Sequence, residues 1–398
     1  MALRVSVLLC AAGVLVPRVN AGEVEPRPNV VFTSSAITVK NVSKAGVLVQ
    51  SGSSRPALLG WDRVKSITGT NSTESKAFAD MAERLWRLRL RIEREDFVLA
   101  EPMADELAIE LKDAHGPSLT LTLAAQTACR LKRGARTAAV DSWLGWLDAS
   151  SDRTNFFADA GPIEPRMNSL RFDDSGLIPE LHPFWLDTPA VRAFAQRATA
   201  AEARGDSARL AWLYVHAAAF EAGQHADGQL LAPASADSAA VMLVNDIVTA
   251  RIADGAGRAK ARMALIARLS AETVSWRRSW LLAGIGRSLV RESERDQKLL
   301  GIDALLQVGG SSDTGSGGLA AVCLAEAIIV LHDLGEVAGA ASLKATLFQR
   351  FSSSPVLTWP PLRKVSVPMA TQPGTPSAAN PASGATNSPA NPATGGAP

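Results

Sequence analysis

The side chains best suited to catalysis or metal binding, five histidines, are spread along the chain without a set of partners at a useful spacing. His216 and His225 are nine residues apart, which matches no standard spacing of zinc ligands. His332 precedes Asp333, but neighbours on a helix point in different directions, and no nearby serine or cysteine completes a proton relay. These residues therefore predict neither a catalytic triad nor a metal centre.

The sequence also lacks the common motifs of phosphate, zinc and nucleophile sites. The segment GIGRS at 284–288 has two glycines but lies inside an expected helix, without the strand that a nucleophile or dinucleotide turn requires. The segment FDDSG at 172–176 lacks the spaced oxygen ligands of a calcium loop. We therefore expect no enzyme, no cofactor and no bound metal.

Two cysteines remain once an expected leader peptide that contains Cys10 is removed. Cys129 and Cys323 each lie in an apolar stretch of helical character, AAQTACRLK and LAAVCLAEA. This setting favours two free, buried thiols, with one long-range disulfide as the alternative.

The overall charge of the chain does not indicate a particular class of binding partner. Lysine and arginine total 41 against 39 aspartates and glutamates, a formal charge of +2. Such a balanced chain creates no long-range field that would attract nucleic acid or an anionic membrane.

One basic stripe is a candidate binding surface. Arg84, Arg87 and Arg91 follow a helical spacing and share one face, while Asp80 and Glu83 each lie four residues before an arginine and neutralise part of it. The other face is apolar, with Leu85, Leu88 and Ile92. A solvated outer face is the favoured interpretation, and a groove for an acidic peptide or glycan is the alternative.

A second basic segment, 274–296, has the pattern of a central core helix. Small and aromatic residues follow one another at one-turn intervals: Trp276, Trp280, Gly284 and Ser288. This seam would let another helix pack closely. Arg287 lies near it and, if buried, needs a carboxylate such as Glu292 or one from another helix, so we expect a structural ion pair, with a ligand-binding role as the alternative.

The first 21 residues have the features of a cleavable secretory signal. Arg4 precedes an apolar run from Val5 to Val16, and the small-residue site ends at Ala21. The run at 319–331 is 13 residues long and interrupted by Glu326, so it predicts a buried helix and no transmembrane segment. We therefore expect export to the periplasm, the cell envelope or the extracellular space.

Residues 22–72 alternate with the period of short strands, in runs such as AITVKN and GVLVQSG. They predict a small β-meander that resembles the SH3-like and Sm-like small barrels. A module of this size is marginal alone, so we expect it to dock on the helices through Trp61 and Ile67.

The remaining chain is mainly helical. We expect helical arrays at 73–149 and 190–355, a proline-rich strap at 150–189 packed over the helices, and a disordered tail at 356–398 that is rich in proline, alanine, serine and asparagine. The candidate helices are 75–94, 97–113, 118–133, 136–149, 190–204, 207–223, 238–254, 257–270, 273–293, 296–307, 319–333 and 337–352. Short turns between them predict antiparallel hairpins.

Three of these hairpins share a pattern in which an alanine follows the turn by five residues. The turns at Glu95-Asp96, Gly134 and Gly335 precede Ala100, Ala139 and Ala340. A small side chain there permits close approach of the two helices. This pattern, with Pro355 after the last hairpin, resembles the tetratricopeptide-like helical repeat proteins. The resemblance implies a degenerate α-solenoid of helix hairpins.

That resemblance implies a non-catalytic scaffold or adaptor that binds a protein or peptide. One alternative is an enzyme or a glycan- or small-molecule-binding protein with a site near His182, Trp185 and Arg287, where the strap crosses the helices. Another is an envelope component that assembles with itself through the β module.

Overall fold

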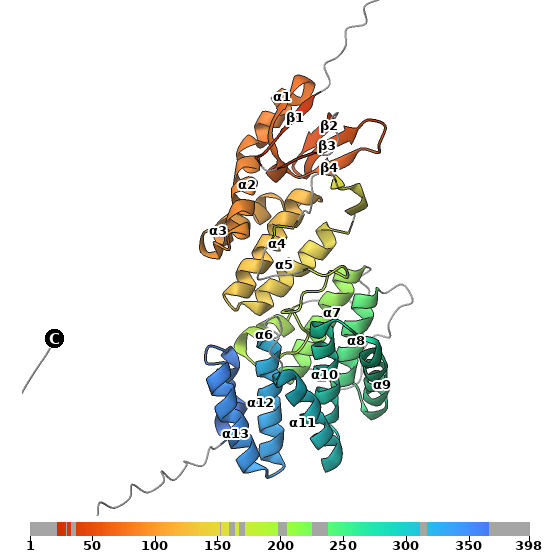
Figure 1. Cartoon of the computed structure of the whole chain (residues 1–398), viewed down its shortest axis with the longest axis vertical. Coiled ribbons are helices and arrows are strands. Elements are labelled where there is room, and N and C mark those ends of the chain that lie inside the picture. The colour runs from red at the N-terminus through yellow and green to blue at the C-terminus, as the bar shows by residue number, and fades with distance from the viewer. Residues whose placement is uncertain are drawn as a thin grey trace, which may run out of the picture.

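The chain is mainly helical, with a small antiparallel sheet region near its N-terminus (Figure 1). The computed structural model describes residues 22–28, 30–32, 37–151, 153–158, 164–166, 172–197, 205–224, 238–310 and 317–365. The expected signal at 1–21 and residues 366–398 of the expected tail lie outside these ranges. The predicted start of the disordered tail at 356 is wrong, because residues 356–365 include the helix Pro360–Lys364 and bury Leu362 and Val365 against the fold. The elements follow one another along the long axis, from the strands at one end to α13 at the other (Figure 1).

The five strands form two hydrogen-bonded sets. β1 (Glu23–Pro26) pairs with β5 (Val64–Thr68), and β2 (Ile37–Ser43), β3 (Gly46–Ser51) and β4 (Ala57–Leu59) form a three-stranded sheet, with every pairing antiparallel. A bridge between Gly22 and Val39 connects the two sets. The order is therefore β5-β1-β2-β3-β4, with the 3-10 turn Trp61–Arg63 between β4 and β5.

Two details of this module differ from the sequence-based prediction. PALLGWDRVKSIT at 56–68, which is a further strand-like run of the sequence, is two strands separated by that 3-10 turn. The strand β1 was not predicted, because its four residues are stabilised by pairing with β5, which is far away in sequence.

The β module is fixed to helix α2 (Ala79–Glu93) by buried contacts. Trp61 is buried and its ring lies 5.2 Å from that of Phe78, just before α2. The buried carboxylate of Asp62 accepts a hydrogen bond from Arg89 at 2.6 Å. Arg27 donates to Glu83 at 2.7 Å. These apolar and charged contacts hold the module against the helices, and Ile67 is buried as well.

Most helices lie close to the ranges expected from sequence, but the helix expected at 190–204 ends at Ala195. In order they are α1 (Ser72–Ser75), α2, α3 (Phe97–Glu110), α4 (Pro117–Lys132), α5 (Arg136–Ala149), α6 (Pro189–Ala195), α7 (Asp206–Glu221), α8 (Ala239–Ile252), α9 (Gly255–Ala271), α10 (Ser275–Leu289), α11 (Arg295–Gly309), α12 (Gly317–Asp333), α13 (Val337–Arg350) and α14 (Pro360–Lys364). From α2 to α13, the main helix contacts within the described ranges join helices that are one or two apart in the chain, as α2 with α4 and α8 with α10.

Three hairpins, α2–α3, α4–α5 and α12–α13, share one turn geometry. In each, one residue has a positive φ: 58° at Glu95, 78° at Gly134 and 83° at Gly335. The next amide donates to the carbonyl five residues earlier, at 2.8 to 2.9 Å, which satisfies a carbonyl at the end of the first helix. The second helix begins directly after that donor residue.

The alanines five residues after each turn, Ala100, Ala139 and Ala340, are all fully buried. The predicted burial of a small residue at this position is therefore confirmed in all three hairpins. A larger side chain would have no free volume there and would force the helices apart.

The left-handed turn residue provides a test of this geometry. Glu95 is the only described residue other than glycine with a positive φ, and one of its carboxylate oxygens is buried without a hydrogen-bond partner. We expect Glu95→Gly to stabilise the protein by up to about 1 kcal/mol and Gly134→Ala to destabilise it by about 1 kcal/mol, since only glycine adopts this conformation without strain. Urea denaturation would measure both changes. Equal effects of the two substitutions would contradict the shared geometry.

Close approach of helices also explains the glycines of the GIGRS segment in α10. A Cβ atom on Gly284 would lie 3.0 Å from Leu265 of α9 and 3.4 Å from Ile247 of α8. A Cβ atom on Gly286 would lie 2.9 Å from the carbonyl oxygen of Gly301 in α11. The predicted seam of small residues is therefore confirmed, and these glycines serve helix packing.

Cys129 and Cys323 are free and buried, so the alternative of a disulfide between them is wrong. Burial raises the pKa of the Cys129 thiol to about 12, and burial likewise raises the pKa of Cys323. Both groups are therefore protonated at neutral pH and poor nucleophiles.

Candidate functional site

Residues 172–188, the C-terminal part of the strap expected at 150–189, are an irregular segment buried between helices, and below the name strap refers to this part. The apolar side chains of Leu177, Ile178, Leu181 and Phe184 are almost completely buried. Because this backbone lacks a regular hydrogen-bond ladder, its carbonyls need other donors. Side chains from α5, α7 and α10 supply them: Trp143 to Gly176 at 2.8 Å, Trp280 to Pro179 at 3.1 Å, Tyr214 to Leu181, Arg136 to Phe184 at 2.9 Å and Arg287 to Trp185 at 3.1 Å.

Beneath the strap, four charged side chains form a buried charge cluster: Glu221, Arg251, Arg287 and Glu326. The Nε and Nη2 atoms of Arg287 each lie 2.7 Å from an oxygen of Glu326, and Nη2 lies 3.1 Å from Glu221. Arg251 donates to both oxygens of Glu221, at 2.7 and 3.2 Å. The cluster connects α7, α8, α10 and α12 with no net charge.

The charges in this cluster stabilise one another. Burial alone would raise the pKa of Glu221, but Arg251 and Arg287 more than compensate and hold the pKa below its usual value. Burial would lower the pKa of Arg251, whereas Glu221 and Glu326 raise it. Glu221 and Arg251 are therefore both held in their ionised forms at neutral pH.

The predicted structural ion pair of Arg287 is confirmed, with partners on other helices. Glu292, named from sequence as a possible partner, instead pairs with Arg258 and Arg262 of α9. Arg287 is 1% exposed, and its Nη2 atom donates to Glu326, to Glu221 and to the carbonyl of Trp185.

His182 and Trp185, the other expected strap residues, lie beside Arg136 at the start of α5. His182 is 2% exposed, and its Nδ1 lies 2.7 Å from Nη2 of Arg136. Arg136 lies 4.3 Å from the centre of the Trp185 ring. Burial, with the charges of Arg136 and Arg287, lowers the pKa of His182 well below its usual value, so the imidazole is neutral at neutral pH.

The structure thus brings His182, Trp185 and Arg287 together, as the sequence predicted, at a junction filled by protein groups. All three are buried and bonded to neighbouring residues, so in this arrangement they present no surface to a ligand.

The basic stripe on α2 lies at the surface and is largely neutralised. Arg84 pairs with Asp80 at 2.8 Å and with Glu110. Arg87 pairs with Glu83 at 2.9 Å. Arg91 lies 3.9 Å from Asp96. The pairing of Arg84 and Arg87 with residues four positions earlier is as predicted, and the pairing of all three arginines weakens their attraction for an acidic ligand.

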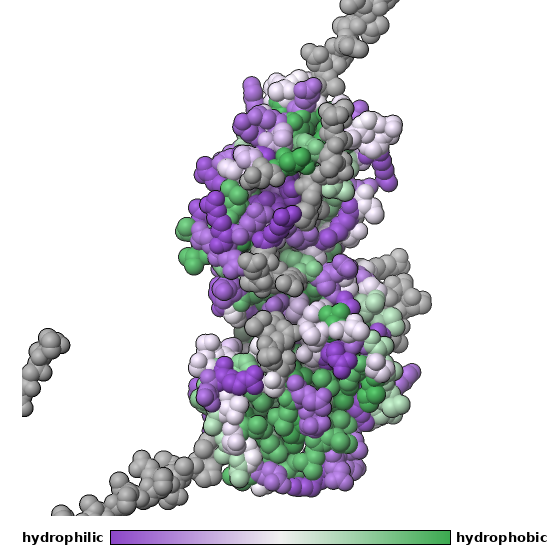
Figure 2. All heavy atoms as spheres, in the orientation of Figure 1, coloured by the Kyte–Doolittle hydropathy of each residue, from purple (hydrophilic) through white to green (hydrophobic). Residues whose placement is uncertain are grey.

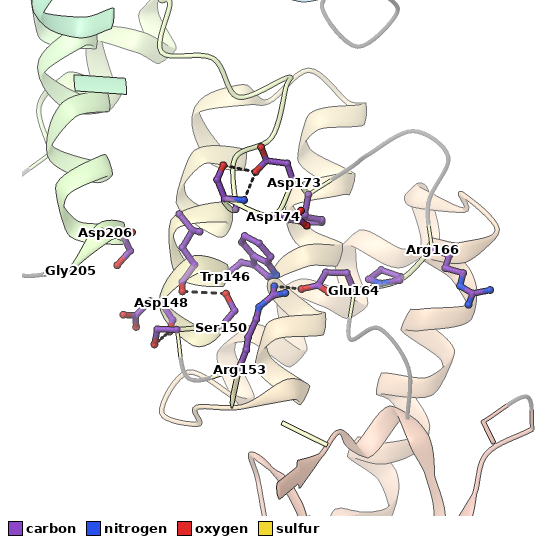
Figure 3. A pocket seen from close by; sticks show the side chains of 17 residues that line it. Trp146, Asp148, Ser150, Arg153, Glu164, Arg166, Asp173, Asp174, Gly205 and Asp206 are labelled. Atoms are coloured by element: carbon purple, nitrogen blue, oxygen red, sulfur yellow. Dashed lines mark hydrogen bonds and ion pairs between the residues drawn. The ribbon is translucent and has the colours of Figure 1, made fainter. Parts of the chain in front are cut away.

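A cavity of about 960 Å³ opens next to the strap, at the end of α5 and the start of α7. Its lining includes Trp146, Arg153, Glu164, Asp173 and Asp206. Trp146 and Arg153 lie near the middle, with Asp206 on one side and Glu164 on the other (Figure 3). We call this space, with its surplus of carboxylates, the acidic cavity. Its size is typical of a ligand-binding cleft.

The floor of the acidic cavity is the buried side chain of Trp146. Trp146 is 2% exposed, and its ring lies 4.3 Å from that of Phe172 and 5.0 Å from the guanidinium of Arg153. Arg153 also pairs with Glu164. Trp146 is therefore held from two directions, and its side-chain N–H has no hydrogen-bond acceptor among the described residues.

The acidic cavity is not arranged for a metal ion. One oxygen of Asp173 accepts from the amides of Ser175 and Leu177, both at 2.9 Å, and the other pairs with Arg277. The carboxylate of Asp173 in the FDDSG segment is therefore already engaged by this turn and by Arg277. Within the described part of the chain, no group of three or more metal-binding side chains converges. The helices described here also include none that is long and apolar enough to cross a membrane.

Sequence reasoning missed Trp146, Arg136, Tyr214 and the two glutamates of the charge cluster. Glu326 did carry a signal, since one carboxylate inside the apolar run 319–331 indicates a buried partner. The other four have no local signal, because their surroundings come from the strap and from distant helices.

Comparisons of this chain with protein-family models, with curated proteins and with solved structures give no match.

Proposed function

We propose that this protein is a non-catalytic scaffold of the cell envelope that binds a protein or peptide on a solenoid-like array of helix hairpins. The observation that carries this proposal is the repeated turn, with a left-handed residue, the same hydrogen bond and a buried alanine in three hairpins. Contacts between helices close in sequence also agree with a tetratricopeptide-like arrangement, in which each unit packs on its neighbours.

The surface also suits a partner. Several large apolar side chains are exposed on helices in the C-terminal half: Met263, Ile266, Leu299, Leu300 and Phe348. Apolar residues gather over α10 to α12 on the face shown in Figure 2. Contiguous apolar surface of this kind is typical of protein interaction sites.

The β module supports the third hypothesis, self-assembly, less well. β5, one end of the strand order, packs against α1 and α2. At the other end, Phe156 bridges to Leu58 of β4, and the amide of Phe157 donates to the carbonyl of Leu58 at 2.8 Å. The chain therefore covers part of each sheet edge, where a second copy would have to pair.

Site-specific cross-linking in the native envelope would test the proposed function. A photoreactive residue placed at Met263 or Leu299 of the tagged chain should give a saturable adduct with one protein. The same residue at Val31, which is 79% exposed near the strands, is the matched control and should give less of that adduct. Adducts of equal yield at all three positions, or none above background, would rule out binding on the helical array.

A further inference from the structure

We propose that the acidic cavity binds a basic, extended segment of the protein partner. This inference rests on the proposed function and adds the place and the chemistry of recognition. Three features of the cavity support it. Carboxylates at its rim pair with no cation among the described residues, the buried N–H of Trp146 has no acceptor among them, and the ring of Trp146 is covered by Phe172 and Arg153.

The carboxylates at the rim outnumber the available cations. Asp148, Asp174 and Asp206 are exposed, and none of them pairs with a cation in the described part of the chain. Arg166 is the one lining arginine without an ion pair among these residues, because Arg153 is neutralised by Glu164. Among the described lining residues, three carboxylates and one guanidinium are without an ion pair, and this negative balance attracts lysine and arginine side chains.

The free N–H of Trp146 indicates what else the ligand must provide. A buried donor without an acceptor is unfavourable, and such donors in native proteins usually have a partner. Because this N–H is buried, a peptide carbonyl supplies the acceptor once the side chains that cover the Trp146 ring move aside. An extended peptide presents this group at every residue, close to the basic side chains that the rim attracts.

The same ring disfavours a glycan as the ligand. Phe172 and Arg153 both contact the Trp146 ring, and the side chain is 2% exposed. It therefore offers no open aromatic face on which a sugar ring could stack. A glycan would have to bind through hydroxyl groups alone, because it lacks the positive charge that the negative rim attracts.

Indole N–H signals from ¹⁵N-tryptophan-labelled full chain provide a local test. The chain has nine tryptophans, and Trp146→Phe identifies the signal of Trp146 by its loss. We expect an acetylated hexapeptide of alternating alanine and lysine to shift this signal. The signal of Trp143, which already donates to Gly176 at 2.8 Å, should stay in place. The glutamate version of the peptide and a soluble peptidoglycan fragment should shift neither.

Removing the rim charges should weaken binding. The triple variant Asp148→Asn, Asp174→Asn and Asp206→Asn should bind the lysine peptide about tenfold more weakly in a fluorescence anisotropy titration, since each exposed charge contributes modestly. The matched control, with the same change in net charge on other exposed carboxylates, is Glu74→Gln, Glu106→Gln and Asp113→Asn, which should change the Kd less than twofold. All these positions are exposed, so both variants should fold.

The outcomes separate this inference from the proposed function. If the lysine peptide leaves the Trp146 signal unchanged, or if the two triple variants bind equally, the inference is wrong. A shift caused by the peptidoglycan fragment instead would assign the cavity to a glycan. If the cross-linked partner persists on the Asp148, Asp174 and Asp206 variant with unchanged affinity, the scaffold function stands and only the assigned cavity fails.

Discussion

Replacing Arg287 with methionine should lower the free energy of unfolding by about 3–5 kcal/mol, one of the largest effects of any single substitution proposed for this protein. The substitution removes both donors that lie 2.7 Å from the oxygens of Glu326, and it leaves that carboxylate buried with Arg251 at 3.3 Å as its remaining charged partner. It also removes the donor to the carbonyl of Trp185 in the strap. Urea denaturation at pH 7, with an unchanged slope, would measure the loss.

Two further variants test whether the burial of the Arg287 ion pairs causes the expected loss of stability. Arg295→Met breaks an ion pair with Glu336 whose side chains are about half exposed, so it should change the free energy of unfolding by less than about 1 kcal/mol. The double variant Arg287→Met and Glu326→Met removes the unpaired charge and should recover at least half of the loss. A loss of less than 1 kcal/mol for Arg287→Met alone would mean that the charge cluster does not hold the helices together.

The helices and hairpin turns of this protein could be predicted from sequence because their causes are local. The period of apolar residues, the glycine at 134 or 335 and the alanine five residues later all lie within one hairpin. The 3-10 turn at Trp61 and the short strand β1 escaped prediction because their stability comes from pairing and packing with residues distant in sequence.

For the candidate sites too, features with a local cause could be predicted, and features that depend on distant residues could not. The stripe of Arg84, Arg87 and Arg91 was found as a helical spacing, and its neutralisation by Asp80 and Glu83 followed from the same spacing. An ion pair of Arg287 with a carboxylate of another helix was among the expectations, but its partners Glu221 and Glu326 were not identified.

The acidic cavity escaped prediction altogether. It is assembled from the end of α5, the strap and the start of α7, with residues 164–166. The path of an irregular segment between helices has no periodicity from which it could be read.

Acidification should destabilise the protein through His182. The pKa of this buried imidazole is well below that in the unfolded chain, which is about 6.5, so between the two values the unfolded state binds the proton and the folded state does not. Stability is therefore complete above about pH 6.5 and falls as the pH decreases. At about 1.4 kcal/mol per pH unit, the loss between pH 6.5 and 5 reaches about 2 kcal/mol.

The groups that face His182 explain why its protonation is unfavourable. Arg136 donates to its Nδ1, and Arg287 adds a second positive charge nearby, so an imidazolium would be buried against like charges. Asparagine at this position carries an uncharged acceptor in place of Nδ1. We therefore expect His182→Asn to flatten the dependence of unfolding free energy on pH between 6.5 and 5, measured by urea denaturation at each pH.

The control for this experiment is His115→Asn, which changes an exposed histidine and should leave the slope of the wild type intact. The lower limit of pH 5 matters, because the pKa of Glu221 is lowered by Arg251 and Arg287, and its contribution is lost only as the pH falls below the ordinary range for glutamate. A slope that persists in His182→Asn would place the proton uptake elsewhere. A slope that disappears would assign the proton uptake on unfolding to His182.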